Sequence, residues 1–231
     1  MSVGDGTSLV PFLKYVCRLA SAHVSHYDEQ RTKGDVLGKA TEVLEREHQV
    51  IQRAVAVMAR IVEQLELKHS IDADILRELI RFMREFGDQC HHGKEESYLF
   101  PLLENKGVPP TGCPLAALKG EHVKGRQLTD DLAAAAVVYI ANQENGRVHL
   151  IETLQGLIIL YPAHIWKEEY LLFPMTGKVL SVNDDELLMQ QFTVAESGLG
   201  LNAHGTYEAL VDDLMRRVGE CPQCSMEKLP R

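Results

Sequence analysis

The chain has 231 residues, of which 45% are hydrophobic and 25% charged, a composition typical of a globular protein with a real core. Its net charge of −9 argues against a nucleic-acid partner, because a protein that follows phosphates needs a basic face. No apolar run approaches the roughly 20 residues of a membrane-spanning helix, so we expect no membrane partner. The absence of a signal pattern in residues 1–11 and the odd number of scattered cysteines lead us to expect a reducing, cytoplasmic location.

Apolar residues at helical spacing predict two long helices in the first half of the chain. The first covers residues 42–67, with Thr41 as its N-cap. The second begins at Ser70 or Asp72 and continues to about residue 103. The glycine- and proline-rich stretch 105–112 is the clearest loop in the sequence.

Two more long helices are predicted at residues 114–142 and 148–172, separated by a break at Asn145-Gly146. Pro162 is expected to kink the fourth helix. No strand pattern of any length is visible. The predicted fold class is therefore all-α, an antiparallel four-helix bundle with short flanking helices at both ends.

The flanks predict shorter elements. Residues 10–22 form an amphipathic pattern, and 184–196 and 206–218 predict two helices that pack outside the bundle. We therefore divide the chain into an N-terminal extension (1–40), the bundle (41–176) and a C-terminal part (177–231). The last part ends in Cys221-Pro222-Gln223-Cys224, which is a redox-sensitive dithiol, half of an intermolecular metal clip or an inert tail.

The pattern His-x-x-Lys-Glu-Glu-x-x-Leu-Phe-Pro occurs twice, from His91 and again from His164, 73 residues later. Each copy places a histidine four residues before a glutamate, so on a helix both side chains leave one face and can meet one ion. A Glu-His pair precedes each copy by about 42 residues, at His48 and at His122. The repeat therefore covers a whole helix pair, and two pairs facing each other could hold two ions.

The metal-ligand candidates are four histidines and two carboxylates: His48, His91, Glu95, His122, His164 and Glu168. Neutral imidazoles and a few carboxylates are what an iron or manganese pair needs. The economical arrangement gives each ion two histidines and lets both glutamates bridge, with an oxo or hydroxo bridge completing the core. One coordination position per ion then stays open for a small molecule. No catalytic protein residue is assigned.

Each feature also has a structural interpretation. A lone buried histidine is usually a core residue, and a single histidine-glutamate pair is common on solvated helix faces. The duplication makes the metal interpretation the stronger one. His92 lies about 100° around the helix from His91, so a surface or second-sphere position is favoured over a fifth metal ligand. The adjoining acidic residues either orient the imidazoles or are solvated helix charge: Glu47, Glu96, Glu121 and Glu169.

These motifs resemble the hemerythrin-like, HHE cation-binding family over about residues 41–176. The resemblance rests on Glu47-His48, the two long motifs, and Glu121-His122 followed by Arg126. It implies a four-helix bundle around a non-haem di-iron centre with a bridging oxygen, with the six candidates at the family's ligand positions. Manganese and zinc are the expected substitutes for iron.

The sequence departs from the oxygen-carrying members at two ligand positions. They have a histidine where this chain has Arg126, and an aspartate five residues after the last histidine, where Glu168 follows His164 by four. The chain therefore resembles the bacterial four-histidine, two-glutamate branch, and reversible oxygen storage is disfavoured.

Three functions remain at this stage. The first is a di-iron protein that binds oxygen, nitric oxide or peroxide. The second is an iron- or oxygen-responsive regulatory or interaction module without turnover, and the third is a metal-free scaffold. Whether the protein is an enzyme, and which electron donor or protein partner it has, is left open.

Overall fold

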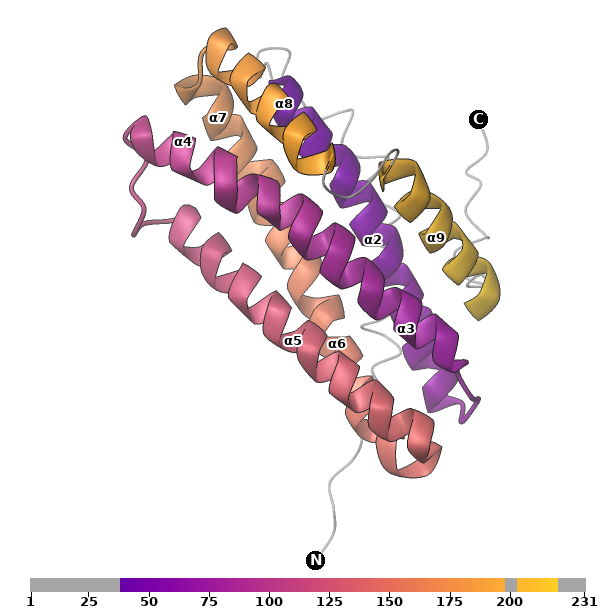
Figure 1. Ribbon diagram of the computed structural model, residues 1–231. Helices are drawn as coiled ribbons and strands as arrows, with labels where there is room; N and C mark the ends of the chain where they lie inside the picture. The colour runs from indigo at the N-terminus through magenta and orange to yellow at the C-terminus, as the bar shows by residue number, and fades with distance from the viewer. Residues whose placement is uncertain (1–37, 198–202, 220–231) are drawn as a thin grey trace, which may run out of the picture.

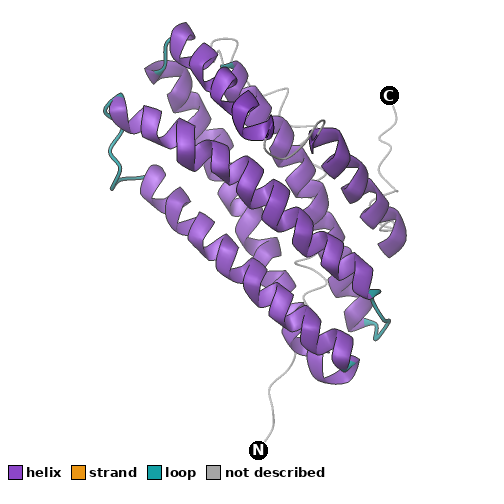
Figure 2. Cartoon of the chain, in the orientation of Figure 1, coloured by secondary structure: helices purple, strands orange, loops and turns teal. Residues whose placement is uncertain are grey.

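The computed structural model describes residues 38–197 and 203–219, which form helices and no strands (Figures 1 and 2). The predicted all-α class is confirmed. The amphipathic pattern at residues 10–22 and the Cys-x-x-Cys motif at Cys221 and Cys224 lie outside the described residues.

Four long helices run side by side as the core of the fold (Figure 1). The second and fourth are continuous helices in which short π-helical segments alternate with α-helix. In chain order the four are α2 (Lys39–Glu66); α3 (Ala73–Phe82) with η1 (Met83–His92), η2 (Glu95–Leu99) and α4 (Phe100–Asn105); α5 (Leu115–Ala141); and α6 (Gln143–Lys167) with η3 (Glu168–Leu172) and α7 (Phe173–Val179).

The start of α2 differs from the prediction because a residue far along the chain caps it. The N-cap is Gly38, not Thr41, and the Thr41 hydroxyl donates to the Gly38 carbonyl at 2.8 Å. The backbone N–H groups of Lys39 and Ala40 donate to the Asp185 carboxylate at 2.9 and 3.0 Å. A Cβ at Gly38 would lie 2.3 Å from that carboxylate, so a larger residue at this position would displace the Asp185 side chain from its capping position.

The turn between α5 and α6 also differs from the prediction. Asn142 alone separates the helices, and its side chain accepts from the N–H of Asn145 at 3.2 Å. Asn145-Gly146 therefore lies in the first turn of α6. A Cβ on Gly146 would lie 2.3 Å from the backbone of Tyr139, so this glycine permits close helix packing and does not break the helix. The fourth helix continues through Pro162.

The π-helical segments carry three of the six predicted ligands: His91 in η1, Glu95 in η2 and Glu168 in η3. The sequence predicted ordinary α-helix there. In a π-helix the hydrogen bonds run from i to i+5, which changes the direction in which each side chain leaves the helix, and such segments are frequent at functional sites.

The apolar core has two parts, separated by a polar layer. Along α2, for example, Leu44 belongs to one cluster and Val50 to the other, with His48 between them. The same order holds along α6 and its extension, where Ile165 and Leu172 belong to different clusters with Glu168 between them. Each long helix therefore contributes its polar residues to one level of the bundle.

Two further helices, α8 (Val182–Ser197) and α9 (Ala203–Val218), lie along α2 on the outside of the bundle (Figure 1). Phe192 of α8 packs in one apolar cluster, and Val211 of α9 packs in the other. Their bounds agree with the two helices predicted for this region, with small extensions at both ends of α8 and at the start of α9.

The helix Gln143–Val179 is long and apolar enough to cross a membrane by length and composition alone, contrary to the expectation that no such segment exists. Its inner face carries the buried His164 and Glu168 and contributes to both apolar clusters. Its inner side therefore belongs to the core of the bundle, whereas Val148, Ile159 and Leu171 on the same helix are exposed.

Candidate metal centre

The structure brings the six predicted residues together in the polar layer, and all six are buried. They form two groups of four, each with its ligand atoms within 4.8 Å of one another. One group contains the histidines of α2 and η1, and the other contains those of α5 and α6. Both groups include the two glutamates: His48, His91, Glu95 and Glu168; and His122, His164, Glu95 and Glu168.

Within each group the two imidazoles point Nε2 at a common position. The Nε2 atoms of His48 and His91 are 3.1 Å apart, and those of His122 and His164 are 3.2 Å apart. Two nitrogens bound to one ion at about 2 Å and at a right angle lie about 3 Å apart. The spacing therefore suits two ligands of one metal ion.

The other ring nitrogen, Nδ1, faces a glutamate in all four histidines. The Nδ1 distances are 2.7–3.1 Å, for the pairs His48–Glu169, His91–Glu47, His122–Glu96 and His164–Glu121. Because an ionised carboxylate only accepts, each Nδ1 carries a proton, and each Nε2 presents a lone pair to the centre when the ring is neutral. The interpretation of these four glutamates as groups that orient the imidazoles is confirmed.

The two shared carboxylates, Glu95 and Glu168, are the strongest indication that this layer binds cations. Both oxygens of Glu95 and both of Glu168 are buried without a partner in hydrogen-bond geometry among the described residues. Histidine Nε2 atoms lie near the Glu168 oxygens: that of His48 is 3.0 Å from Oε2, and that of His164 is 3.1 Å from Oε1. Facing lone pairs and unpartnered carboxylates are unfavourable in a buried site unless cations lie between them, so the residues fit metal ions.

The shifted pKa values of the layer have the same cause, the burial of histidines and carboxylates close together. Burial lowers the pKa of His48, but the carboxylates of Glu168 and Glu169 more than offset this and raise it to about 9. Burial lowers the pKa of His91 to about 4. Burial and the neighbouring Glu168 raise the pKa of Glu95 well above its ordinary value. Without cations, the buried groups compete for protons that metal ions would replace.

Cationic side chains surround the layer on its outer side. Lys94 pairs with Glu47, and Lys167 pairs with Glu121 at 2.5 Å, which is the equivalent contact in the other half. Arg126 donates to Glu96 at 3.0 Å. Arg126, which replaces a histidine of the oxygen-carrying members, therefore binds Glu96, the glutamate that orients His122, and is not one of the metal-ligand candidates.

Sequence reasoning missed a contact from the C-terminal helices. His204 of α9 lies 3.0 Å from Glu47, and Glu196 of α8 pairs with Lys94 at 2.5 Å. Glu47, Cys90 and His204 are close enough to hold a metal ion, but the ammonium group of Lys94 occupies the Glu47 carboxylate and opposes a cation there. No local pattern marks His204 or Glu196, since both act through distant residues.

His92 is the other residue whose place the sequence did not fix. It is buried, so a surface position is wrong, and its ring stacks on His122 with centroids 3.8 Å apart. Its Nε2 has no partner among the described residues, while its Nδ1 lies 3.3 Å from Asp88. His92, His122 and His164 also place their ligand atoms within 4.8 Å of one another.

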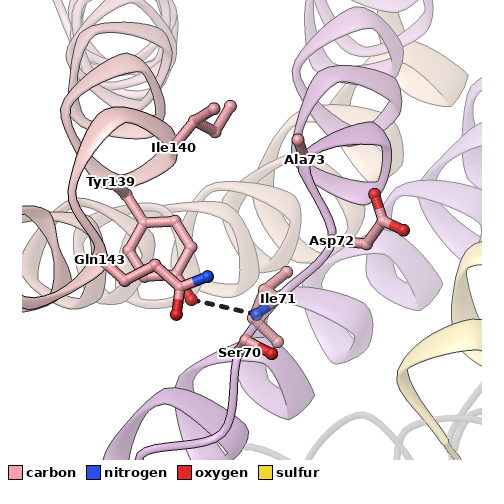
Figure 3. A pocket seen from close by; sticks show the side chains of 7 residues that line it. All are labelled: Ser70, Ile71, Asp72, Ala73, Tyr139, Ile140 and Gln143. Carbon is pink, nitrogen blue, oxygen red and sulfur yellow. Dashed lines mark hydrogen bonds between the residues drawn. The ribbon is translucent and has the colours of Figure 1, made fainter.

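The surface pocket of about 400 Å³ at the other end of the bundle is not part of this centre (Figure 3). It lies between the start of α3 and the α5–α6 turn, about 30 Å along the helix axis from the polar layer. The N–H of Ile71 donates to the Tyr139 hydroxyl across it at 3.0 Å. Its lining has no cluster of metal-ligand or catalytic side chains, and we interpret it as a gap where the start of α3 meets the α5–α6 turn.

Comparisons with known proteins agree with the geometry. The family model described as Hemerythrin HHE cation binding domain matches residues 39–176. Uncharacterized proteins of Mycobacterium bovis and of two Mycobacterium tuberculosis strains are each 30% identical over 142 residues, which is 62% of this chain and 55% of theirs. The chain spans about half the length of these curated relatives. No solved structure matches.

Proposed function

The chain belongs to the hemerythrin HHE cation-binding family, and on this premise we propose that it is a non-haem di-iron protein. In this proposal it binds a small oxidant (oxygen, nitric oxide or peroxide) at a carboxylate- and oxo-bridged iron pair in its cytoplasmic location. The observation that carries the proposal is the pair of four-donor groups that share Glu95 and Glu168.

The donor types favour iron. Two histidines and one carboxylate around an ion, with positions left open, are the ligand set typical of non-haem Fe(II) sites that react with oxygen. His48 and His91 would hold one iron, and His122 and His164 the other. Manganese and zinc accept the same donors and are the substitutes to be tested.

The bound irons would supply electrons and an open coordination position for the oxidant. The protein residues fix the imidazoles and balance the charge. Each Nδ1–H···carboxylate bond holds its ring in one orientation and increases the basicity of Nε2. Lys94, Lys167 and Arg126 offset the negative charge of these outer carboxylates. The two apolar clusters above and below the layer exclude water from it.

The test is metal analysis with Mössbauer spectroscopy on protein reconstituted anaerobically with iron. We expect two irons per chain and, after oxidation, an oxo-to-iron charge-transfer band that changes on adding azide or nitric oxide. Protein that retains no iron, or a spectrum that is insensitive to all small ligands, would rule the proposal out.

The contact with the C-terminal helices favours one alternative, an iron- or oxygen-responsive module without turnover. His91 is linked through Glu47 to His204 of α9, and through Lys94 to Glu196 of α8. A change at the ligand could therefore alter the packing of both helices. This alternative predicts that chelation increases hydrogen exchange or proteolysis in α8 and α9, with negligible turnover of any oxidant.

A further inference from the structure

The internal repeat supplies a comparison between the two ion positions. The second and fourth helices are equivalent with an offset of 73 residues, so that Ile165 corresponds to His92 and Tyr161 corresponds to Asp88. Moving from the first helix to the third, 74 residues later, replaces Gln52 by Arg126. The donors are equivalent in the two halves, but the polar group His92–Asp88–Arg126 exists only in one.

This polar group lies beside the second pair of histidines. His92 stacks on His122 at 3.8 Å between centroids, and its ring centroid is 5.5 Å from that of His164. The planes of His92 and His122 are only 15° apart. An ion bound to Nε2 lies in the plane of the ring that binds it, so one ion cannot lie in both stacked planes. His92 is therefore a neighbour of this ion position and not a ligand of it.

Asp88 and Arg126 fix the tautomer of His92. The Asp88 carboxylate accepts from Arg126 Nη1 at 2.8 Å and from His92 Nδ1 at 3.3 Å. Because Nδ1 carries the proton, the buried and unpartnered Nε2 of His92 offers a lone pair. A buried acceptor without a donor costs free energy, which a ligand that brings a proton would recover.

Resting on the proposed function, we propose that the small ligand binds the ion held by His122 and His164, and that His92 Nε2 accepts a hydrogen bond from it. The preferred ligand is then one that carries a proton, such as hydrogen peroxide, over nitric oxide or an anion such as azide. At the other ion the equivalent residue, Ile165, is apolar and buried, and offers no such contact.

The test compares His92→Phe, which retains a flat ring and removes the acceptor, with Ile165→Val at the equivalent position. We expect two irons per chain in both variants. The second-order rate constant of the reduced protein with hydrogen peroxide should fall about tenfold in His92→Phe, as expected for one lost hydrogen bond. The dissociation constant for azide should stay the same or decrease, since a facing lone pair has been removed. Ile165→Val should match the wild type in both measurements.

Other outcomes separate the two proposals. A wild-type protein without iron contradicts the proposed function itself. Loss of iron in His92→Phe would show that His92 is a ligand, and an unchanged peroxide rate, or a rate that falls equally in Ile165→Val, would show that the contact does not exist. His92→Leu provides a second variant if the larger ring prevents folding, with the same expected results.

Discussion

In the first half of the bundle, Glu47 and Lys94 are completely buried, whereas their counterparts in the second half, Glu121 and Lys167, are 23% and 28% exposed. The inner donors show no such difference. The Nε2–Nε2 distances are 3.1 and 3.2 Å in the two halves. The donors therefore remain equivalent while their surroundings have diverged.

The divergence follows from the helices added at the C-terminal end. Helices α8 and α9 pack mainly against α2 and the second helix, in the first half of the bundle (Figure 1). A donor position is constrained by the ion it would bind, within a few tenths of an ångström, and tolerates little change. The outer partners are constrained only by charge and hydrogen bonding, so they can be buried in one half and solvated in the other.

The largest effect should come from the carboxylates that the two halves share. Replacing Glu168 by alanine removes oxygens that lie near His48 of one half and His164 of the other. We expect both irons to be lost together, with affinity reduced by at least about a hundredfold, more than outer-sphere changes cause. Iron per chain after gel filtration measures this. Loss of only one iron would mean that the halves bind independently.

The second effect tests the difference in burial directly. Lys94→Met removes the buried cation of Glu47 and leaves it only the partly exposed His204, so it should destabilise the protein by about 3 kcal/mol. The matched change Lys167→Met removes a solvent-accessible pair and should cost about 0–1 kcal/mol. Urea unfolding at fixed iron loading compares the two. Equal losses would show that the cover from α8 and α9 has no energetic role.

The third comparison concerns the imidazole-orienting glutamates. Glu47→Gln and Glu121→Gln should each lower iron affinity about 10- to 100-fold. The effect of Glu47→Gln should be the larger, because water can replace the partly exposed Glu121 but not the buried Glu47. Competition with a chelator of known affinity gives both values. The reverse order would contradict the assignment of the buried half as the more sensitive one.

The smallest effect concerns pH and the docking of α9. Hydrogen bonds with Cys90, Glu196 and Glu47 raise the pKa of His204 to about 11, from an unfolded value of about 6.5. Because the folded pKa is raised, protonated His204 stabilises the folded protein fully below pH 6.5. This contribution to the free energy of unfolding is lost as the pH rises toward 11.

Because His204 is 32% exposed, we expect His204→Gln to cost only about 1 kcal/mol at pH 6. The difference from the wild type should shrink steadily toward pH 10. Thermal or urea unfolding across this range measures it, and a difference that grows with pH would contradict the sign of the pKa shift.

Much of the fold could be predicted because helix signals are local. The apolar periodicity located the long helices, and Asp72, one of the two proposed starts of the second helix, is its N-cap. The start of α2 could not be predicted, since Asp185 supplies its cap from 145 residues away. The role of Gly146 depended on the approach of Tyr139 from another helix. Both misses have the same cause, a tertiary contact that replaces a local signal.

The sequence by itself determined which residues form the candidate centre, because a duplicated spacing places histidine and glutamate on the same face of each helix. Only the tertiary structure decided which residues contact these ligand candidates and their glutamate partners. The adjacent residues His91 and His92 both lie in the π-helical segment η1 and both are buried, a position for His92 that the spacing did not favour. The partners Glu169 for His48 and His204 for Glu47 come from distant helices, and helix packing, not spacing along the chain, brings them together.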